Sequence, residues 1–206
     1  MDNALTAAGL RAQLGRELLI GREIVVLQTT TSTNDEVWRL ARAGAAEGLV
    51  VFAEEQTRGR GQHSHSWESA PGKGLWFSVL LRPGIAPRDS ARLTTWAANT
   101  VAQVVQEIVQ RKALVSPPND VYVDGRKMAG VLVEMRAQTG APHLAITGIG
   151  LNVNQQPCDF SEQLRERAVS LAMLRGGPVA RDLLALKLLR KLDTTYHDTF
   201  ALSHSR

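Results

Sequence analysis

The chain has 206 residues, 44% hydrophobic and 21% charged, which is ordinary for a globular protein and argues against intrinsic disorder. The net charge is +4, but the basic residues are scattered, so we expect a solvated basic surface and no DNA binding. No apolar stretch reaches about 18 residues and the start does not resemble a signal peptide, so we expect a cytoplasmic protein without a membrane span. The single cysteine, Cys158, cannot form an internal disulfide, and no paired cysteines indicate a zinc site.

The first half of the chain predicts three strands and one helix. Runs rich in β-branched and apolar residues predict strands at 23–28, 49–53 and 75–81. Between the first two strands, TSTNDEVWRLARAG predicts a helix that ends near Gly44. Its start offers three N-cap candidates, which are Ser32, Thr33 and Asn34.

The second half predicts a helix over 93–108, from apolar residues that share one helical face. The segments 121–123 and 128–135 are predicted to pair as a hairpin around the dipeptide Asp124-Gly125. A strand over 144–154 with a glycine-marked interruption and an amphipathic helix over 184–200 follow. The mixed order, without a regular βαβ repeat, predicts one α/β domain over 1–206 with a mixed, largely antiparallel sheet flanked by helices.

Residues 57–67, TRGRGQHSHSW, form a glycine- and arginine-rich loop. Gly59 and Gly61 allow the main chain to approach a ligand closely, and Arg58 and Arg60 can offer paired donors to phosphate or carboxylate oxygens. The alternative for an isolated GRG is an exposed turn. Neither GxxxxGK[ST] nor a GxGxxG after a strand is present.

Two later segments carry polar residues that are candidates for binding. In residues 117–134, Asn119 and Asp120 follow two prolines and Lys127 follows the hairpin turn. An acid there could hold Mg²⁺ while the ammonium faces a phosphate or carboxylate, although a lysine after a hairpin turn is more often simply solvated. Asn152, in an otherwise apolar strand, must find partners and could serve either the fold or a ligand.

Taken together and in this order, four stretches resemble the biotin–protein ligase family. They are TSTNDE (31–36), EEQTRGRGQHSHSWESAPGKGLWFS (54–78), PPNDVYVDGRKMAGVLVE (117–134) and GIGLNVN (148–154). The resemblance implies a catalytic domain like that of class II aminoacyl-tRNA synthetases and the activity of a biotin–[acetyl-CoA-carboxylase] ligase. Such an enzyme uses MgATP to convert biotin to biotinyl-5′-AMP. It then transfers biotin to a lysine of the biotin carboxyl carrier protein of acetyl-CoA carboxylase or a related carboxylase.

The resemblance also implies a role for each matching residue. Biotin contacts are implied for Ser32, Thr33, Asn34, Gln56, Arg60, Gly61, Gln62 and Lys127, and catalytic roles for Arg60 and Lys127. ATP contacts are implied for Trp67, Asn119, Asp120, Gly130 and Asn152, with Asp120 also serving Mg²⁺. The glycine-rich loop is expected to be mobile without ligand and ordered with it.

The chain departs from the family pattern in two places. Gln62, Ser64 and His65 replace arginine, glycine and arginine, which should weaken retention of the adenylate. Ser116 and Pro117 stand where lysine and tryptophan are usual.

We expect no amino-terminal helix-turn-helix and no carboxy-terminal SH3-like domain, and a homodimer is possible. The alternatives are a lipoate or octanoate transferase relative and a non-catalytic biotin-binding protein.

Overall fold

The computed structural model describes residues 4–15, 17–62, 65–139 and 142–200. Its centre is a seven-stranded sheet in the order β1-β2-β5-β9-β8-β7-β6. The strands are β1 (Glu23–Thr30), β2 (Leu49–Gln56), β5 (Gly74–Leu81), β6 (Ala113–Ser116), β7 (Asp120–Val123), β8 (Arg126–Arg136) and β9 (Leu144–Asn152). Only β1 and β2 pair in parallel within this sheet, so it is mixed and largely antiparallel.

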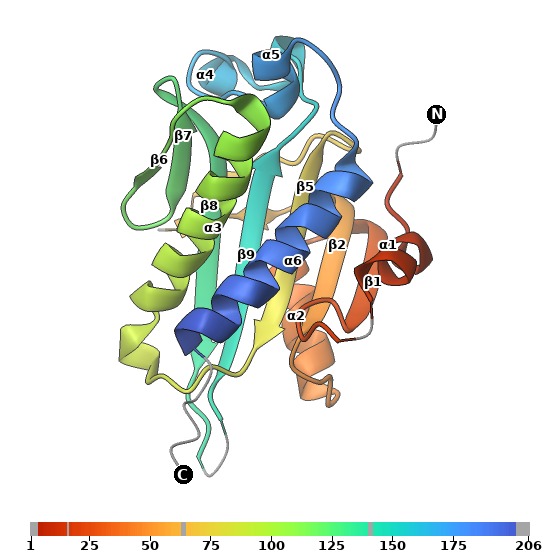
Figure 1. Cartoon of the computed structure of the whole chain (residues 1–206), viewed down its shortest axis with the longest axis vertical. Helices are drawn as coiled ribbons and strands as arrows, with labels where there is room; N and C mark the ends of the chain where they lie inside the picture. The colour runs from red at the N-terminus through yellow and green to blue at the C-terminus, as the bar shows by residue number, and fades with distance from the viewer. Residues whose placement is uncertain (1–3, 16, 63–64, 140–141, 201–206) are drawn as a thin grey trace.

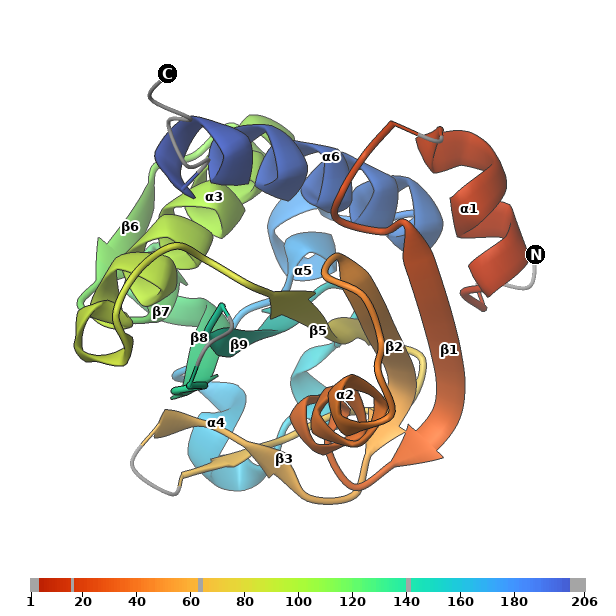
Figure 2. The same ribbon diagram turned by 90° about the horizontal axis from the view of Figure 1, so that it is seen from below.

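Helices cover both faces of the sheet. Helices α3 (Ala91–Val109) and α6 (Arg181–Phe200) lie side by side across one face (Figure 1). Helix α2 (Thr33–Arg42) and the short strand pair β3 (Gly59–Arg60) and β4 (Ser66–Trp67) lie on the other (Figure 2). Among the described residues, no helix combines the length and the apolar character needed to cross a bilayer.

Two apolar cores hold these layers together. The larger core lies between the sheet and the helices α3 and α6, and it includes Phe52, Phe77 and Leu188, all almost fully buried. The smaller core lies under α2 and includes Val37, Trp38 and Ile146. Since both faces of the central strands are covered, β5 is buried along its whole length.

The predicted hairpin is confirmed by β7 and β8. Asp124 and Gly125 both adopt positive φ, 50° and 73°, the geometry that a tight two-residue hairpin turn requires. The pairing of β7 with β8 shifts register between Val121 and Tyr122, so β8 contains a bulge there.

Two expectations about the elements differ from the structure. Strand β9 is continuous through Gly148 and Gly150, so the expected interruption is wrong. Sequence analysis did not predict helix α1 (Ala7–Leu14), which buries Leu10 and Leu14. It also did not predict β6, the pair β3–β4, or the short helices α4 (Glu162–Arg165), α5 (Leu171–Arg175), Pro87–Asp89 and Pro157–Asp159.

Candidate functional site

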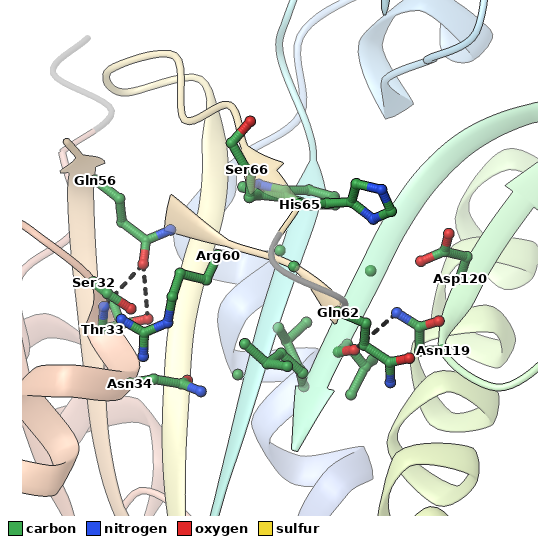
Figure 3. A pocket seen from close by; sticks show the side chains of 18 of the residues that line it. Ser32, Thr33, Asn34, Gln56, Arg60, Gln62, His65, Ser66, Asn119 and Asp120 are labelled. Atoms are coloured by element: carbon green, nitrogen blue, oxygen red, sulfur yellow. Dashed lines mark hydrogen bonds between the residues drawn. The ribbon is translucent and has the colours of Figure 1, made fainter. Parts of the chain in front are cut away.

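A cavity of about 280 Å³ lies on the α2 side of the sheet. One wall comes from the start of α2 and the end of β2, and the other from β7 and β8 (Figure 3). Residues 57–62 and 65–67, called the flap below, cross between the walls through β3 and β4. Every predicted site residue except Asn152 lines this cavity: Ser32, Thr33, Asn34, Gln56, Arg60, Gly61, Gln62, Trp67, Asn119, Asp120, Lys127 and Gly130.

The wall beside α2 is a network of buried polar groups. Gln56 Oε1 accepts hydrogen bonds from the Thr33 amide at 2.9 Å and the Thr33 hydroxyl at 3.2 Å. The Ser78 hydroxyl lies 2.7 Å from Thr33 Oγ1 and 2.6 Å from Asn34 Oδ1. Ser78 is fully buried, and its one sequence signal is a serine inside the apolar strand LWFSVLL. These bonds fix the side chains that a polar ligand would meet at this end.

Asn34 reaches this position because Gly148, on β9, has no side chain. A Cβ atom at residue 148 would lie 2.3 Å from Asn34 Oδ1, closer than atoms can approach. The side-chain Nδ2 of Asn34 also donates to Glu134 Oε2 at 2.6 Å, and this bond links α2 to β8. The glycine is therefore required for the close approach of the helix to the sheet.

Arg60 of the flap is held by two carboxylates. Its guanidinium donates to both oxygens of Asp35, at 2.7 and 2.8 Å, and lies 3.4 Å from Glu134 Oε2. The hydrogen bonds with Asp35 raise the pKa of Arg60, an effect that burial partly opposes and the charge of Glu134 reinforces. Sequence analysis had not singled out Asp35 or Glu134, because acids in a first helical turn or along a strand are ordinary.

The opposite wall presents a flat surface made by two glycines. Gly130 and Gly150 pair directly across β8 and β9, and the indole of Trp67 lies against both. A Cβ atom at Gly130 would lie 2.8 Å from Trp67 Cζ3, and one at Gly150 would lie 2.5 Å from Trp67 Cε2. This surface therefore accepts a planar ring, and side chains at either position would displace it.

Asp120 and Lys127 meet beside that ring. Lys127 Nζ lies 2.7 Å from Asp120 Oδ2 and 5.4 Å from the centre of the Trp67 ring, a cation–π contact. Next to them, the side-chain Nδ2 of Asn119 donates to the Val131 carbonyl at 3.1 Å. Lys127 is therefore positioned with its charge at the cavity rather than in open solvent.

The second oxygen of Asp120 suits a cation. Among the described residues Asp120 Oδ1 has no hydrogen-bond partner, although it is buried. The same part of the chain contains no group of three or more His, Cys, Asp or Glu residues arranged around one metal position. Because Mg²⁺ commonly uses one or two carboxylates together with phosphate oxygens, Asp120 fits a magnesium ion that arrives with a nucleotide.

Asn152 lies beside the cavity and not in its lining. Its side chain is 5% exposed, donates to the Lys127 carbonyl at 3.4 Å and accepts from Gln155 at 2.9 Å. Of the residues that depart from the family pattern, Gln62, His65 and Pro117 line the cavity, whereas Ser64 lies outside the described residues.

The comparison with protein families matches residues 26–152, more than half of the chain, to the model of the biotin/lipoate A/B protein ligase family. The chain belongs to this family. Family membership and the sheet topology together confirm the predicted fold class, a mixed α/β domain of the class II synthetase-like kind.

Relatives in this family include two similar bacterial proteins. The bifunctional ligase/repressor BirA of Bacillus subtilis is 35% identical, over 94% of this chain and 59% of its own length. The biotin–[acetyl-CoA-carboxylase] ligase of Mycobacterium tuberculosis is 32% identical, over 86% of this chain and 67% of its own. The chain thus spans about three fifths of the length of the bifunctional relative.

A solved structure shares the fold of this chain. The biotin protein ligase of Aquifex aeolicus in complex with biotin and ATP is 29% identical with a TM-score of 0.73. The match covers 88% of this chain and 73% of the Aquifex chain. The shared fold therefore includes nearly all of the architecture described above.

Proposed function

We propose that the chain is a biotin–protein ligase that activates biotin with MgATP and transfers it to a lysine of a biotin carboxyl carrier protein. The observation that carries this proposal is that Arg60 and Lys127 line one cavity, which has a polar wall and a flat wall. Similarity to the Mycobacterium tuberculosis and Aquifex proteins supports it, because their names specify biotin ligation.

In the first step, a biotin carboxylate oxygen bonds to the α-phosphorus of ATP while the bond from that phosphorus to the pyrophosphate oxygen breaks. The reaction brings two anions together, so fixed positive charge is the main requirement. Lys127 would face the carboxylate and the α-phosphate, and Arg60 would leave Asp35 to join it from the flap. Asp120 would hold a magnesium ion, which would supply positive charge beside the phosphates.

In the second step, the amine of the carrier lysine attacks the carbonyl carbon of biotinyl-5′-AMP. The bond from that carbon to the phosphate oxygen breaks, AMP leaves, and an amide forms. This chain needs no covalent nucleophile of its own, because the mixed anhydride is already activated. Its contribution is to hold the adenylate and exclude water, and the flap covers the cavity for that purpose.

The polar wall favours biotin over lipoate within the family. The ureido ring of biotin carries hydrogen-bond donors and an acceptor, which match the hydroxyl and amide groups of Thr33, Asn34 and Gln56. A lipoyl or octanoyl chain is apolar at that end and could form no hydrogen bond with these groups.

The test uses the chain as it exists, with biotin or lipoate, MgATP and a purified biotin carboxyl carrier domain. Biotin-dependent pyrophosphate exchange, followed by biotin on the carrier lysine in a mass spectrum, is the expected result. Exchange that depends on lipoate alone would instead identify a lipoate ligase. Biotin binding without exchange or transfer would identify a binding protein and overturn the proposal.

A further inference from the structure

The bulge in β8 decides which face of the sheet Lys127 occupies. Val121 pairs with Ala129 and Tyr122 pairs with Lys127, which leaves Met128 as an extra residue on β8. Val121 and Ala129 belong to the main core. The next pair in the ladder, Tyr122 and Lys127, therefore faces the cavity side of the sheet. With regular pairing instead of a bulge, Met128 would pair with Tyr122 and Lys127 with Val123. Lys127 would then share the face of Ala129 and direct its amine into the apolar core.

At Lys127 a loop segment takes the place of strand β9. Strand β9 pairs with β8 from Ala129 onward, and at Lys127 its position is occupied by residues 167–169. The Lys127 amide donates to the Arg167 carbonyl at 2.7 Å, and the Val169 amide donates to the Lys127 carbonyl at 2.9 Å. The main chain of the bulge is thus held on both sides.

A buried amide pair connects this segment to the end of β9. Asn152 donates to the Lys127 carbonyl at 3.4 Å, and Gln155 Nε2 donates to Asn152 Oδ1 at 2.9 Å. Gln155 Oε1 accepts from the Val153 amide at 2.8 Å, and its carbonyl accepts from the Ser170 hydroxyl at 2.7 Å. Gln155 is 1% exposed and lies outside the cavity lining, so it contacts no ligand.

We propose that Gln155 is a positioning residue that acts through Asn152 to hold the bulge and aim the Lys127 amine at the reacting oxygens. The inference rests on the proposed function for the identity of the reaction. The placement of Lys127 follows from the register and the hydrogen bonds alone. Since a displacement of about 1 Å in a positioned group can cost on the order of a hundredfold in rate, loosening the bulge should affect chemistry more than binding.

The chain provides a closely matched control for Gln155. The side chain of Asn154 also makes two hydrogen bonds, from Asn154 Nδ2 to the Val179 carbonyl at 2.9 Å and from the Val179 amide to Asn154 Oδ1 at 2.8 Å. Gln155→Ala and Asn154→Ala therefore each remove two bonds of equal length from the same turn. Of these two side chains, only that of Gln155 bonds to Asn152.

Two measurements on these variants test the proposal. In single-turnover formation of biotinyl-adenylate, Gln155→Ala should lower the rate constant about 10- to 100-fold with little change in the KM for biotin, while Asn154→Ala stays near the parent rate. Amide hydrogen exchange at Lys127 and Val169 should accelerate in Gln155→Ala and not in Asn154→Ala. Asn152→Ala should reproduce both effects, and the double variant with Gln155→Ala should add little.

Each outcome decides one question. Equal rates and equal exchange in Gln155→Ala and Asn154→Ala would overturn the positioning role, even if the parent chain is active. If the parent chain forms no biotinyl-adenylate, the proposed function is overturned. In that case the exchange data alone still decide whether Gln155 holds the bulge. If Gln155→Ala does not fold, Asn152→Ala carries the same comparison.

Discussion

Arg60 and Asp35 form a two-bond ion pair that ties the flap to the first turn of helix α2. Their side chains are 37% and 48% exposed, so solvent screens the pair and its net contribution is about 1 kcal/mol or less. A contact this weak can be exchanged for a ligand anion. Arg60 can therefore leave Asp35 for an anion in the cavity at a small cost in free energy.

Asp35→Asn should release the flap in the absence of ligand. Loss of one exposed ion pair predicts about a two- to fivefold faster trypsin cleavage after Arg58 or Arg60. Glu36→Gln is the control, because Glu36 pairs with Arg39 and not with the flap. Equal cleavage of both variants would show that Asp35 does not restrain Arg60.

Biotin with MgATP should protect the flap of the unmodified chain. The expected physical cause is the exchange of Asp35 for phosphate and carboxylate oxygens around Arg60, which adds contacts across the cavity. Limited proteolysis with and without both substrates measures the effect. Identical cleavage rates would contradict the predicted ordering of this loop.

Gly150→Ala should weaken ATP binding. The new methyl group would lie 2.5 Å from the present position of the Trp67 ring, so the ring must move off the β8–β9 surface. Stacking of a base on an aromatic side chain is worth about 1–3 kcal/mol, so we expect the KM for ATP to rise about tenfold or more. Gly177→Ala is the control, since no atom lies within 4 Å of a Cβ there.

Lys127→Ala should mainly reduce the rate of adenylate formation. Removal of one preorganised charge from a developing anion typically costs about 10²- to 10³-fold in rate. Lys112→Ala removes an exposed lysine with the same change in net charge and should leave the rate unchanged. Unchanged single-turnover adenylate formation in Lys127→Ala would remove the role assigned to this residue.

Arg181→Met should destabilise the fold strongly. Arg181 is 2% exposed and donates to Glu54 Oε2 at 2.6 Å and to the Gly74 carbonyl at 3.2 Å. The substitution leaves Glu54 buried without this partner, which costs about 3–5 kcal/mol in the free energy of unfolding. Urea denaturation measures this loss in the free energy of unfolding. The double variant with Glu54→Leu should recover part of the loss, and no recovery would contradict the pairing.

Local chemistry made much of the fold predictable. The Asp124-Gly125 turn, the apolar runs of the long strands and the helical spacing in α3 and α6 each act over a few residues. Helix α1 was missed because its eight residues bury only Leu10 and Leu14, which is a weak periodic signal. The glycines of β9 were misinterpreted as a break, whereas they admit Asn34 and Trp67 from other elements.

The site was predictable as a set of residues but not as a set of contacts. The motif resemblance named many of the residues that line the cavity, together with Asn152, which lies beside it. The partners of Arg60 and Lys127 depend on which carboxylates the fold brings near them, and no spacing rule supplies that. The orientation of Lys127 depends on one extra residue in β8, and simple alternation cannot show a bulge. Gln155 bonds to the nearby Asn152, but Asn152 reaches Lys127 across 25 residues of sequence, so no local pattern reveals the connection.

The two walls of the cavity come from separate parts of the chain. The polar wall is built from residues 32–34 and 56, and the flat wall and its charged pair from residues 67, 120, 127, 130 and 150. Under the proposed function, a redesign for a different acid would confine its substitutions to the first group and leave the second group unchanged. An ATP analogue with an altered base would call for substitutions in the second group alone, so the choice of acid and the choice of nucleotide could be varied independently.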